Sequence, residues 1–154
     1  MIARKPDHVE EVAQGVDTVL SAPEKRPDVR PIPHPYDRGL SHAELGDHSE
    51  ALDDFTEAIR LRPNYSPAFF NRGLSHGKLG VHSKAIEDFN EAIRFRPNYA
   101  GAFLARGLSH AALRNHGAAI KDYTEAIRLK PDYAEAFYIR GNNQAALGNR
   151  EAAI

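Results

Sequence analysis

A 34-residue period constrains this chain more than any other feature. The pentapeptide Arg-Gly-Leu-Ser-His occurs at residues 38–42, 72–76 and 106–110, and Arg140-Gly141 opens a fourth occurrence at the same interval. The tetrapeptide Glu-Ala-Ile-Arg and a proline three residues after it repeat in step. Such a period indicates a repeat protein in which each unit packs only against its neighbours. From residue 32 onward the chain therefore divides into copies 32–65, 66–99 and 100–133 and a partial copy 134–154.

Each copy is predicted to form two helices. In the second copy, Ser66 is a suitable N-cap and Pro67 suits the first helical turn, so a first helix should start there and end before Gly80. A second helix should start at about Ser83 and end before Pro97, which cannot continue the hydrogen-bond ladder. The partial copy is expected to hold a complete first helix and only the opening of a second one near residue 151.

Small residues at fixed offsets predict a close crossing of the two helices in each copy. Glycine recurs at positions 39, 73, 107 and 141, and alanine recurs at several offsets in the second helix. An aromatic residue beside each crossing fills the remaining space, namely Phe55, Phe89 and Tyr123.

The pattern resembles the tetratricopeptide repeat (TPR) family. The residues that carry the resemblance are an aromatic, glycine, alanine, aromatic, alanine and proline series, seen in the second copy as Phe69, Gly73, Ala85, Phe89, Ala92 and Pro97. The resemblance implies an all-α, right-handed α-solenoid of about three and a half repeats in a TPR domain at residues 32–154. The chain departs from the family by placing arginine before each glycine and histidine where tyrosine is common.

The recurring arginines have a structural explanation. An aspartate recurs at the same interval, so each guanidinium is expected to pair with it while the aliphatic stem packs across the next helix. The pairs expected are Arg38, Arg72 and Arg106 with Asp54, Asp88 and Asp122.

Residues 1–31 lie outside the repeats. Valines at helical spacing predict an amphipathic helix at residues 7–21, and five prolines make residues 22–35 a stiff connector. Three alternatives stay open for the helix. It caps the first repeat, it lies in a groove of its own or a neighbouring molecule, or it is disordered in isolation, because a lone helix of this length is marginal in water.

Composition excludes several classes of protein. The formal net charge is −1, which argues against a nucleic-acid partner and against a polybasic membrane-surface protein. The chain has no cysteine, so disulfides, cysteine zinc sites and thiol nucleophiles are excluded. Neither a membrane-spanning apolar run nor a signal peptide is evident, and we therefore expect a cytoplasmic protein.

The polar residues do not predict an enzyme. A catalytic centre needs a unique constellation, whereas nearly every polar residue here recurs in each repeat, so we expect no catalytic residue, no metal and no cofactor. Histidines form three pairs six residues apart, whose rings could approach one another across the turn, at His42 and His48, His76 and His82, and His110 and His116. The favoured explanation is that each histidine packs where tyrosine is common in the family. A second explanation is a response to pH. The remaining explanation is a zinc site, which would need another ligand that does not recur in the repeats.

The resemblance implies a groove on the first helices that takes an extended or helical peptide. The residues predicted to line it are Tyr36, Leu40, Phe70, Asn71, Leu74, Leu104, Leu108, Tyr138 and Asn142. A family variant holds a partner's terminal carboxylate with lysines, arginines and asparagines at these places. Apolar residues occupy most of them here, which argues against recognition of chaperone tails.

The predicted function is a protein-interaction scaffold that binds a protein or peptide through this groove. The alternative is self-association into a homo-oligomer, because the last repeat has an apolar face without a neighbour. The candidate contacts for self-association are Val12, Val16, Val19, Phe137 and Leu147.

Overall fold

The structure, a computed structural model, describes residues 34–152, with side chains as far as Asn149. These residues belong to one compact unit, Pro33–Ile154. The predicted N-terminal helix at 7–21, with Val12, Val16 and Val19, and all but the last two residues of the predicted connector lie outside the described residues.

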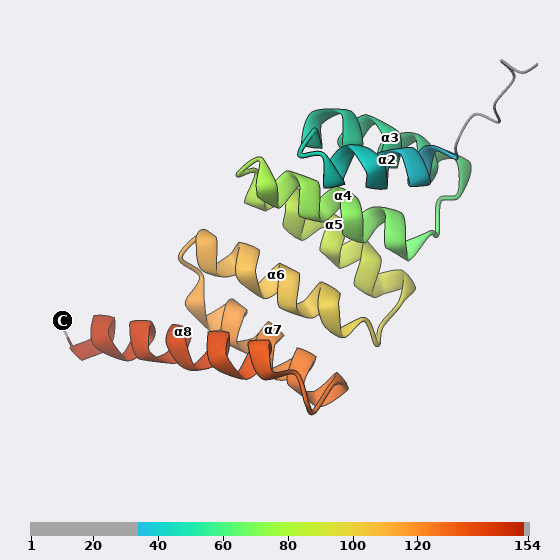
Figure 1. The fold of residues 1–154 in the computed structure, drawn as a ribbon. Coiled ribbons are helices and arrows are strands. Elements are labelled where there is room, and N and C mark those ends of the chain that lie inside the picture. The colour runs from blue at the N-terminus through green and yellow to red at the C-terminus, as the bar shows by residue number, and fades with distance from the viewer. Residues whose placement is uncertain (1–33, 153–154) are drawn as a thin grey trace, which may run out of the picture. The chain divides into compact units, whose positions relative to one another are not determined.

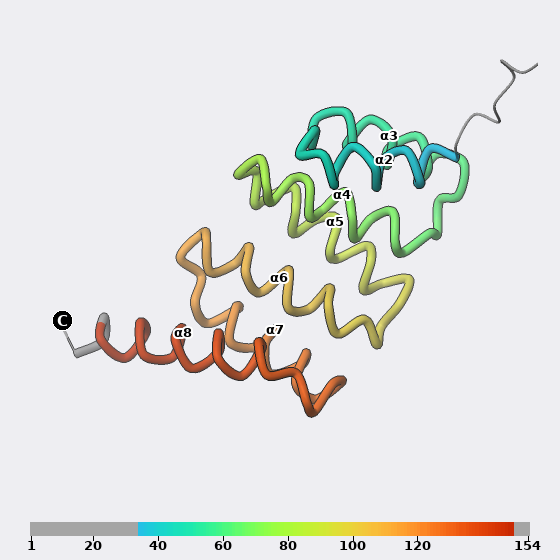
Figure 2. The backbone as a smooth tube through the Cα atoms, viewed as in Figure 1, coloured from blue at the N-terminus to red at the C-terminus, as the bar shows by residue number. Residues whose placement is uncertain are grey.

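The described part of the chain consists of seven α-helices and contains no strand. They are α2 (Pro35–Glu44), α3 (His48–Leu61), α4 (Ser66–Lys78), α5 (His82–Phe95), α6 (Ala100–Ala112), α7 (His116–Leu129) and α8 (Ala134–Ala152). Figure 1 shows α2 with α3, α4 with α5, and α6 with α7 as successive hairpins, and Figure 2 traces the same path along the backbone. None of these helices is both long and apolar enough to cross a membrane.

Local signals set the helix boundaries. The turn inside each hairpin needs a residue with positive φ, and Gly46 (+85°) and Gly80 (+77°) supply it in the first two repeats. Arg114 takes the same conformation in the third repeat with φ of 65°. The second helices end two residues before each repeated proline, and the intervening residue is extended, as Arg96 is with φ of −139°.

The predicted N-cap at Ser66 is wrong. Tyr65 is the N-cap of α4 and makes no side-chain capping bond, while Ser66 is the first helical residue. The Ser66 hydroxyl instead donates a 2.8 Å hydrogen bond to the carbonyl oxygen of Ala92 in α5. The hydroxyl that was expected to cap the helix is therefore used in a buried hydrogen bond between two helices.

The predicted break in the partial fourth copy is also wrong. Helix α8 continues without interruption from Ala134 through Gly148 to Ala152. In the preceding repeats the turn places a second helix against the first, and the packing of the two fixes the turn. At the equivalent place in the fourth copy, α8 continues through Gly148 to Ala152.

Each hairpin is held by an aromatic ring packed against a glycine. A Cβ atom built on Gly39 would lie 2.6 Å from the Phe55 ring, and one on Gly73 would lie 2.7 Å from the Phe89 ring. Tyr123 makes the same contact with Gly107 in the third repeat. All three aromatic residues are almost completely buried. The crossing predicted from small residues is therefore confirmed.

Tyr123 differs from Phe55 and Phe89 only by a hydroxyl that has no use in this core. The hydroxyl oxygen is buried and has no hydrogen-bond partner among the described residues. Burial, with a smaller contribution from the charge of Asp122, raises the pKa of Tyr123 to about 12.

We expect Tyr123→Phe to raise the free energy of unfolding by about 1 kcal/mol, because it removes a buried, unpaired polar group without changing the packing. Since the pKa is higher in the folded state, the unfolded chain ionises first, and wild-type stability should fall above about pH 10. Tyr123→Phe should lose less stability than the wild type over the same pH range, because it has no hydroxyl to ionise at this position. Urea denaturation at neutral and alkaline pH measures both effects. A less stable variant would show that the hydroxyl is paired in solution.

Candidate functional site

The first helices of successive repeats lie side by side. Helix α2 contacts α4, and α4 contacts α6, whereas each second helix packs mainly between two first helices. In Figure 1, α2, α4, α6 and α8 follow one another down the stack. Side chains at equivalent positions of the first helices therefore form one continuous surface.

A depression of about 260 Å³ opens on this surface between α4 and α6. Its lining includes Leu74 and Leu108, which are 38% and 43% exposed. Gly77 lies beside them, and a Cβ atom built on it would meet nothing within 4 Å. Buried Phe89 contributes to the lining from beneath. The depression is thus apolar, open and unobstructed. We refer to it as the α4–α6 groove.

Half-buried aromatic side chains extend the surface toward α2. The Phe70 ring centroid lies 4.7 Å from that of Tyr99, and the Tyr36 centroid lies 5.0 Å from that of Tyr65 in an edge-on contact. The Asn71 amide donates hydrogen bonds to the Tyr36 hydroxyl (3.1 Å) and to a carbonyl oxygen of its own helix. The first of these bonds joins α2 to α4, and the second lies within α4.

The remaining predicted groove residues fall in different environments. Leu40 is half-buried on α2, and Tyr138 and Asn142 are exposed on α8. Leu104 is buried in the core against Tyr123, so it supports the surface rather than forming it. The structure thus brings Leu74 and Leu108 together in one depression.

Two ionisable lining residues were not predicted. Lys78, near the end of α4, and His82, at the start of α5, both line the α4–α6 groove. They come from different helices across the Gly80 turn, so no single helical stripe contains both. The sequence signal that could have found them is their position on either side of the turn predicted at Gly80, which brings them close together.

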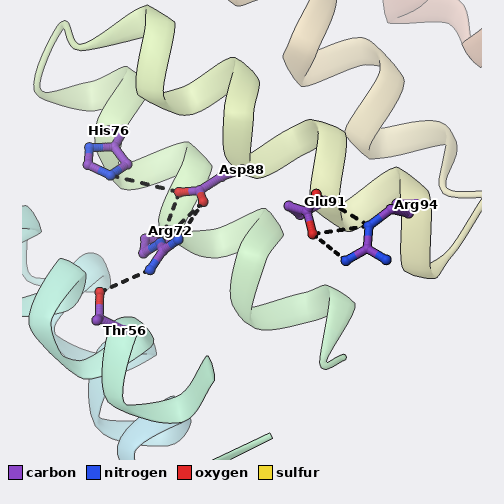
Figure 3. Close-up of polar contacts among 6 residues, drawn as sticks. All are labelled: Thr56, Arg72, His76, Asp88, Glu91 and Arg94. Atoms are coloured by element: carbon purple, nitrogen blue, oxygen red, sulfur yellow. Dashed lines mark hydrogen bonds and ion pairs between the residues drawn. The ribbon is translucent and has the colours of Figure 1, made fainter. Parts of the chain in front are cut away.

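A repeated ion pair links the two helices of each repeat and then links neighbouring repeats. The guanidinium groups of Arg72 and Arg106 each donate to their aspartates at 2.7 Å, and Arg38 donates to Asp54 at 2.6 Å. Arg72 also donates to the Thr56 hydroxyl of the preceding repeat at 3.1 Å. Figure 3 shows Arg72 held between Asp88 and Thr56. The predicted pairing is therefore confirmed, and it also joins neighbouring repeats.

A family model described as tetratricopeptide repeat matches residues 36–100 and 104–154. The chain belongs to the tetratricopeptide repeat family. This agrees with the seven helices of residues 34–152 and with the three and a half repeats, approximately, that the period predicts. No curated protein sequence matches the chain significantly.

Solved structures of TPR domains share the fold. The first TPR domain of Spaghetti (RPAP3), bound to the HSP90 peptide SRMEEVD, is 26% identical, with a TM-score of 0.73 over 74% of this chain and 90% of that one. The first TPR domain of human RPAP3 is 26% identical, with a TM-score of 0.74 over 78% of this chain and 94% of that one. MamA, at 22% identity and a TM-score of 0.73 over 76% of this chain and 68% of that one, shows the same fold.

Three of the histidines in this TPR domain lie beside the repeated ion pair. The first histidine of each pair faces the aspartate of the ion pair, with His42 Nδ1 2.7 Å from Asp54 and the His76 and His110 Nε2 atoms 3.8 and 3.9 Å from theirs. Nδ1 of His116 lies 2.9 Å from the Asn143 amide oxygen. Among the described residues, no group of three histidines and acids could hold a metal ion.

One of these histidines should make stability depend on pH. Burial lowers the pKa of His76; Arg72 and Lys84 lower it further, whereas Asp88 and Glu87 raise it. The unfolded chain therefore binds the proton more readily, and acid favours unfolding.

We expect the melting temperature to fall between about pH 7.5 and about pH 5.5, around the ordinary histidine pKa of about 6.5. His76→Asn should be measured beside the wild type and should show a smaller fall. A wild-type melting temperature that stays constant over this range would contradict the prediction.

Proposed function

We propose that this chain is a non-enzymatic protein-interaction module that binds an apolar peptide, helical or extended, in the α4–α6 groove. The observation that carries the proposal is the unobstructed apolar depression in which Leu74 and Leu108 are exposed side by side around Gly77. Exposed contiguous apolar surface on a folded domain is typical of an interaction site.

Similarity to a peptide-bound TPR domain supports the general function, and the residues of the groove suggest a different ligand chemistry. The peptide bound to the first TPR domain of Spaghetti carries three acidic residues among its seven. In the α4–α6 groove the lining offers a single lysine, Lys78, beside leucine, alanine and glycine. Apolar anchors should therefore supply most of the binding energy, and acidic groups should contribute only through Lys78 and His82.

The geometry of Gly77 gives a direct test. Gly77 lines the groove, and a Cβ atom added there would meet nothing within 4 Å, so a larger side chain at this position starts in open space inside the groove. Gly117, in the outer helix α7, is equally unobstructed and does not line the groove. Gly77→Glu and Gly117→Glu therefore form a matched pair with the same added side chain.

The experiment selects binders from a displayed library of random 15-residue peptides against the full chain. We expect enriched peptides with two or more large apolar side chains, and their binding should shift the methyl resonances of Leu74 and Leu108. Gly77→Glu should abolish binding, whereas Gly117→Glu should leave it unchanged. Peptides that bind equally to both variants, or a selection without enrichment, would overturn the proposal.

Self-association is the second candidate function, favoured by the apolar surface of α8. Phe137 and Tyr138 are both exposed on this helix, and Leu147 is half-buried. Sedimentation equilibrium over a wide concentration range distinguishes the two cases. A mass that stays at 17.1 kDa excludes self-association, and a mass that rises to twice that value supports it.

A further inference from the structure

A second depression, of about 350 Å³, is lined by residues of α3, α4 and α5 and shares no lining residue with the α4–α6 groove. We refer to it as the α3–α5 cleft. The most buried part of its lining is the ion pair of the second repeat, in which the Asp88 and Arg72 side chains are 6% and 22% exposed. Figure 3 shows His76 on one side of this pair and Thr56 on the other. The cleft therefore has a polar floor that the fold holds in place.

The floor offers hydrogen-bond donors that the fold leaves unused. Arg72 donates to Asp88 through Nε and Nη2 and to the Thr56 hydroxyl through Nη1. A guanidinium has more N–H donors than these bonds use, so donors of Arg72 remain for a ligand. A carboxylate is the acceptor that suits them best, because a hydrogen bond between two charged groups is stronger than one between neutral groups.

Two exposed side chains of opposite charge, Lys84 and Glu87, complete the lining. They lie three residues apart on α5, which places them on the same side of the helix. Neither belongs to an ion pair among the residues that the structure describes. Their counterparts in the other repeats do not combine a cation with an anion, being Glu50 and Asp53 in the first repeat and Ala118 and Lys121 in the third. The second repeat is therefore distinct from the first and the third at this place.

The charges of the cleft oppose a simple ion and favour a zwitterion. An anion beside Lys84 would also lie near the carboxylates of Glu87 and Asp88. A cation beside Glu87 would also lie near Lys84 and Arg72. A molecule that carries both charges a few atoms apart is attracted at each end. Leu52, half-buried on α3, adds an apolar wall for a hydrocarbon group.

We propose that the α3–α5 cleft binds a free α-amino acid with an aliphatic side chain. The carboxylate of the ligand binds Lys84 and the unused donors of Arg72, its ammonium group binds Glu87, and its side chain packs on Leu52. The volume of the cleft lies in the range of small-molecule pockets. The ligand contacts α3 of the first repeat and α5 of the second, so it strengthens the junction that the Arg72–Thr56 hydrogen bond already makes.

The test titrates L-leucine into the full chain and follows the amide resonances. We expect saturable shifts at residues 52–56 and 84–88 with a Kd of about 1 mM, because an open cleft with two exposed charges supplies little binding energy. Two analogues each lack one charge, 4-methylpentanoate without the ammonium group and 3-methylbutylamine without the carboxylate. Each should bind at least about tenfold more weakly than leucine. Saturating leucine should also raise the melting temperature, since it binds only the folded chain.

Lys84→Gln and Glu87→Gln should each weaken leucine binding about tenfold, and both positions are exposed, so the fold should be unaffected. Lys121→Gln is the matched control, because it is the counterpart of Glu87 on α7, is exposed and does not line the cleft. It should leave binding unchanged. Circular dichroism checks the helical content of each variant.

Three results would overturn the proposal. They are the absence of saturable shifts at the solubility limit of leucine, equal binding of leucine and either analogue, and shifts confined to the α4–α6 groove. The peptides of the α4–α6 groove are tested with other variants and share no contact with the cleft, so either proposal can fail alone.

Discussion

Gly73→Ala is expected to lower the free energy of unfolding by about 2 kcal/mol. The added methyl would lie 2.7 Å from Cε1 and 2.9 Å from Cδ1 of the Phe89 ring, closer than carbon atoms can pack. Phe89 is 1% exposed and cannot move without displacing neighbours in α4 and α6. Overpacking of this kind costs up to about 3 kcal/mol, and the better helix propensity of alanine returns only about 1 kcal/mol.

Gly141→Ala is the matched control, at the same repeat position of α8. Nothing lies within 4 Å of the added methyl, so only the propensity term remains, and stability should rise by up to about 1 kcal/mol. Urea denaturation followed by circular dichroism compares the two variants. If both destabilised the chain to the same extent, backbone flexibility rather than ring contact would explain the repeated glycine.

The fold was predictable because its strongest signals are local and repeated. Gly80 places the turn of the second repeat and Pro97 ends its second helix, as expected. Gly46 and Pro63 do the same in the first repeat. The same period also aligned the arginines with the aspartates, which is why their pairing could be inferred from sequence. In each of these cases a signal in one repeat was supported by its copies.

Predictions failed where a contact between helices replaced a local preference. Ser66 is a good capping residue by type, but the carbonyl of Ala92 lies within reach of its hydroxyl and takes it. The contact with Ala92 cannot be seen in the residues around Ser66. The opening of a second helix predicted near residue 151 is wrong as well, because α8 runs through Gly148 to Ala152.

The candidate site was only partly predictable for a related reason. Leu104 and Phe70 hold the same repeat position, but Leu104 is buried against Tyr123 while Phe70 reaches the surface and packs on Tyr99. The periodicity predicts which way a side chain points, but it does not predict how deeply the side chain is buried. His82 was missed because its contribution depends on how α5 sits beside α4.

The second large effect is expected for Asp88→Ala, at about 3 kcal/mol of lost stability. The Asp88 side chain is 6% exposed and accepts three hydrogen bonds from Arg72, whose side chain is 22% exposed. Its removal leaves a largely buried guanidinium without a counter-charge, which is the costly way to break an ion pair. It also weakens the junction with the preceding repeat, since Arg72 is the donor to Thr56.

Glu91→Ala, in the same helix, is the control for the loss of an exposed ion pair. It shows how much of the effect of Asp88→Ala comes from the burial of the Asp88–Arg72 pair. Glu91 pairs with Arg94 at 2.7 Å, and their side chains are 39% and 62% exposed. Figure 3 draws this pair beside the Asp88 cluster. Such surface pairs contribute about 0.5 kcal/mol or less, so this variant should be nearly neutral. Adding Arg72→Leu to Asp88→Ala should recover part of the loss, because no unpaired charge then remains. If the double variant is no more stable than Asp88→Ala, the stranded charge is not the cause, and the cost lies in the lost hydrogen bonds themselves.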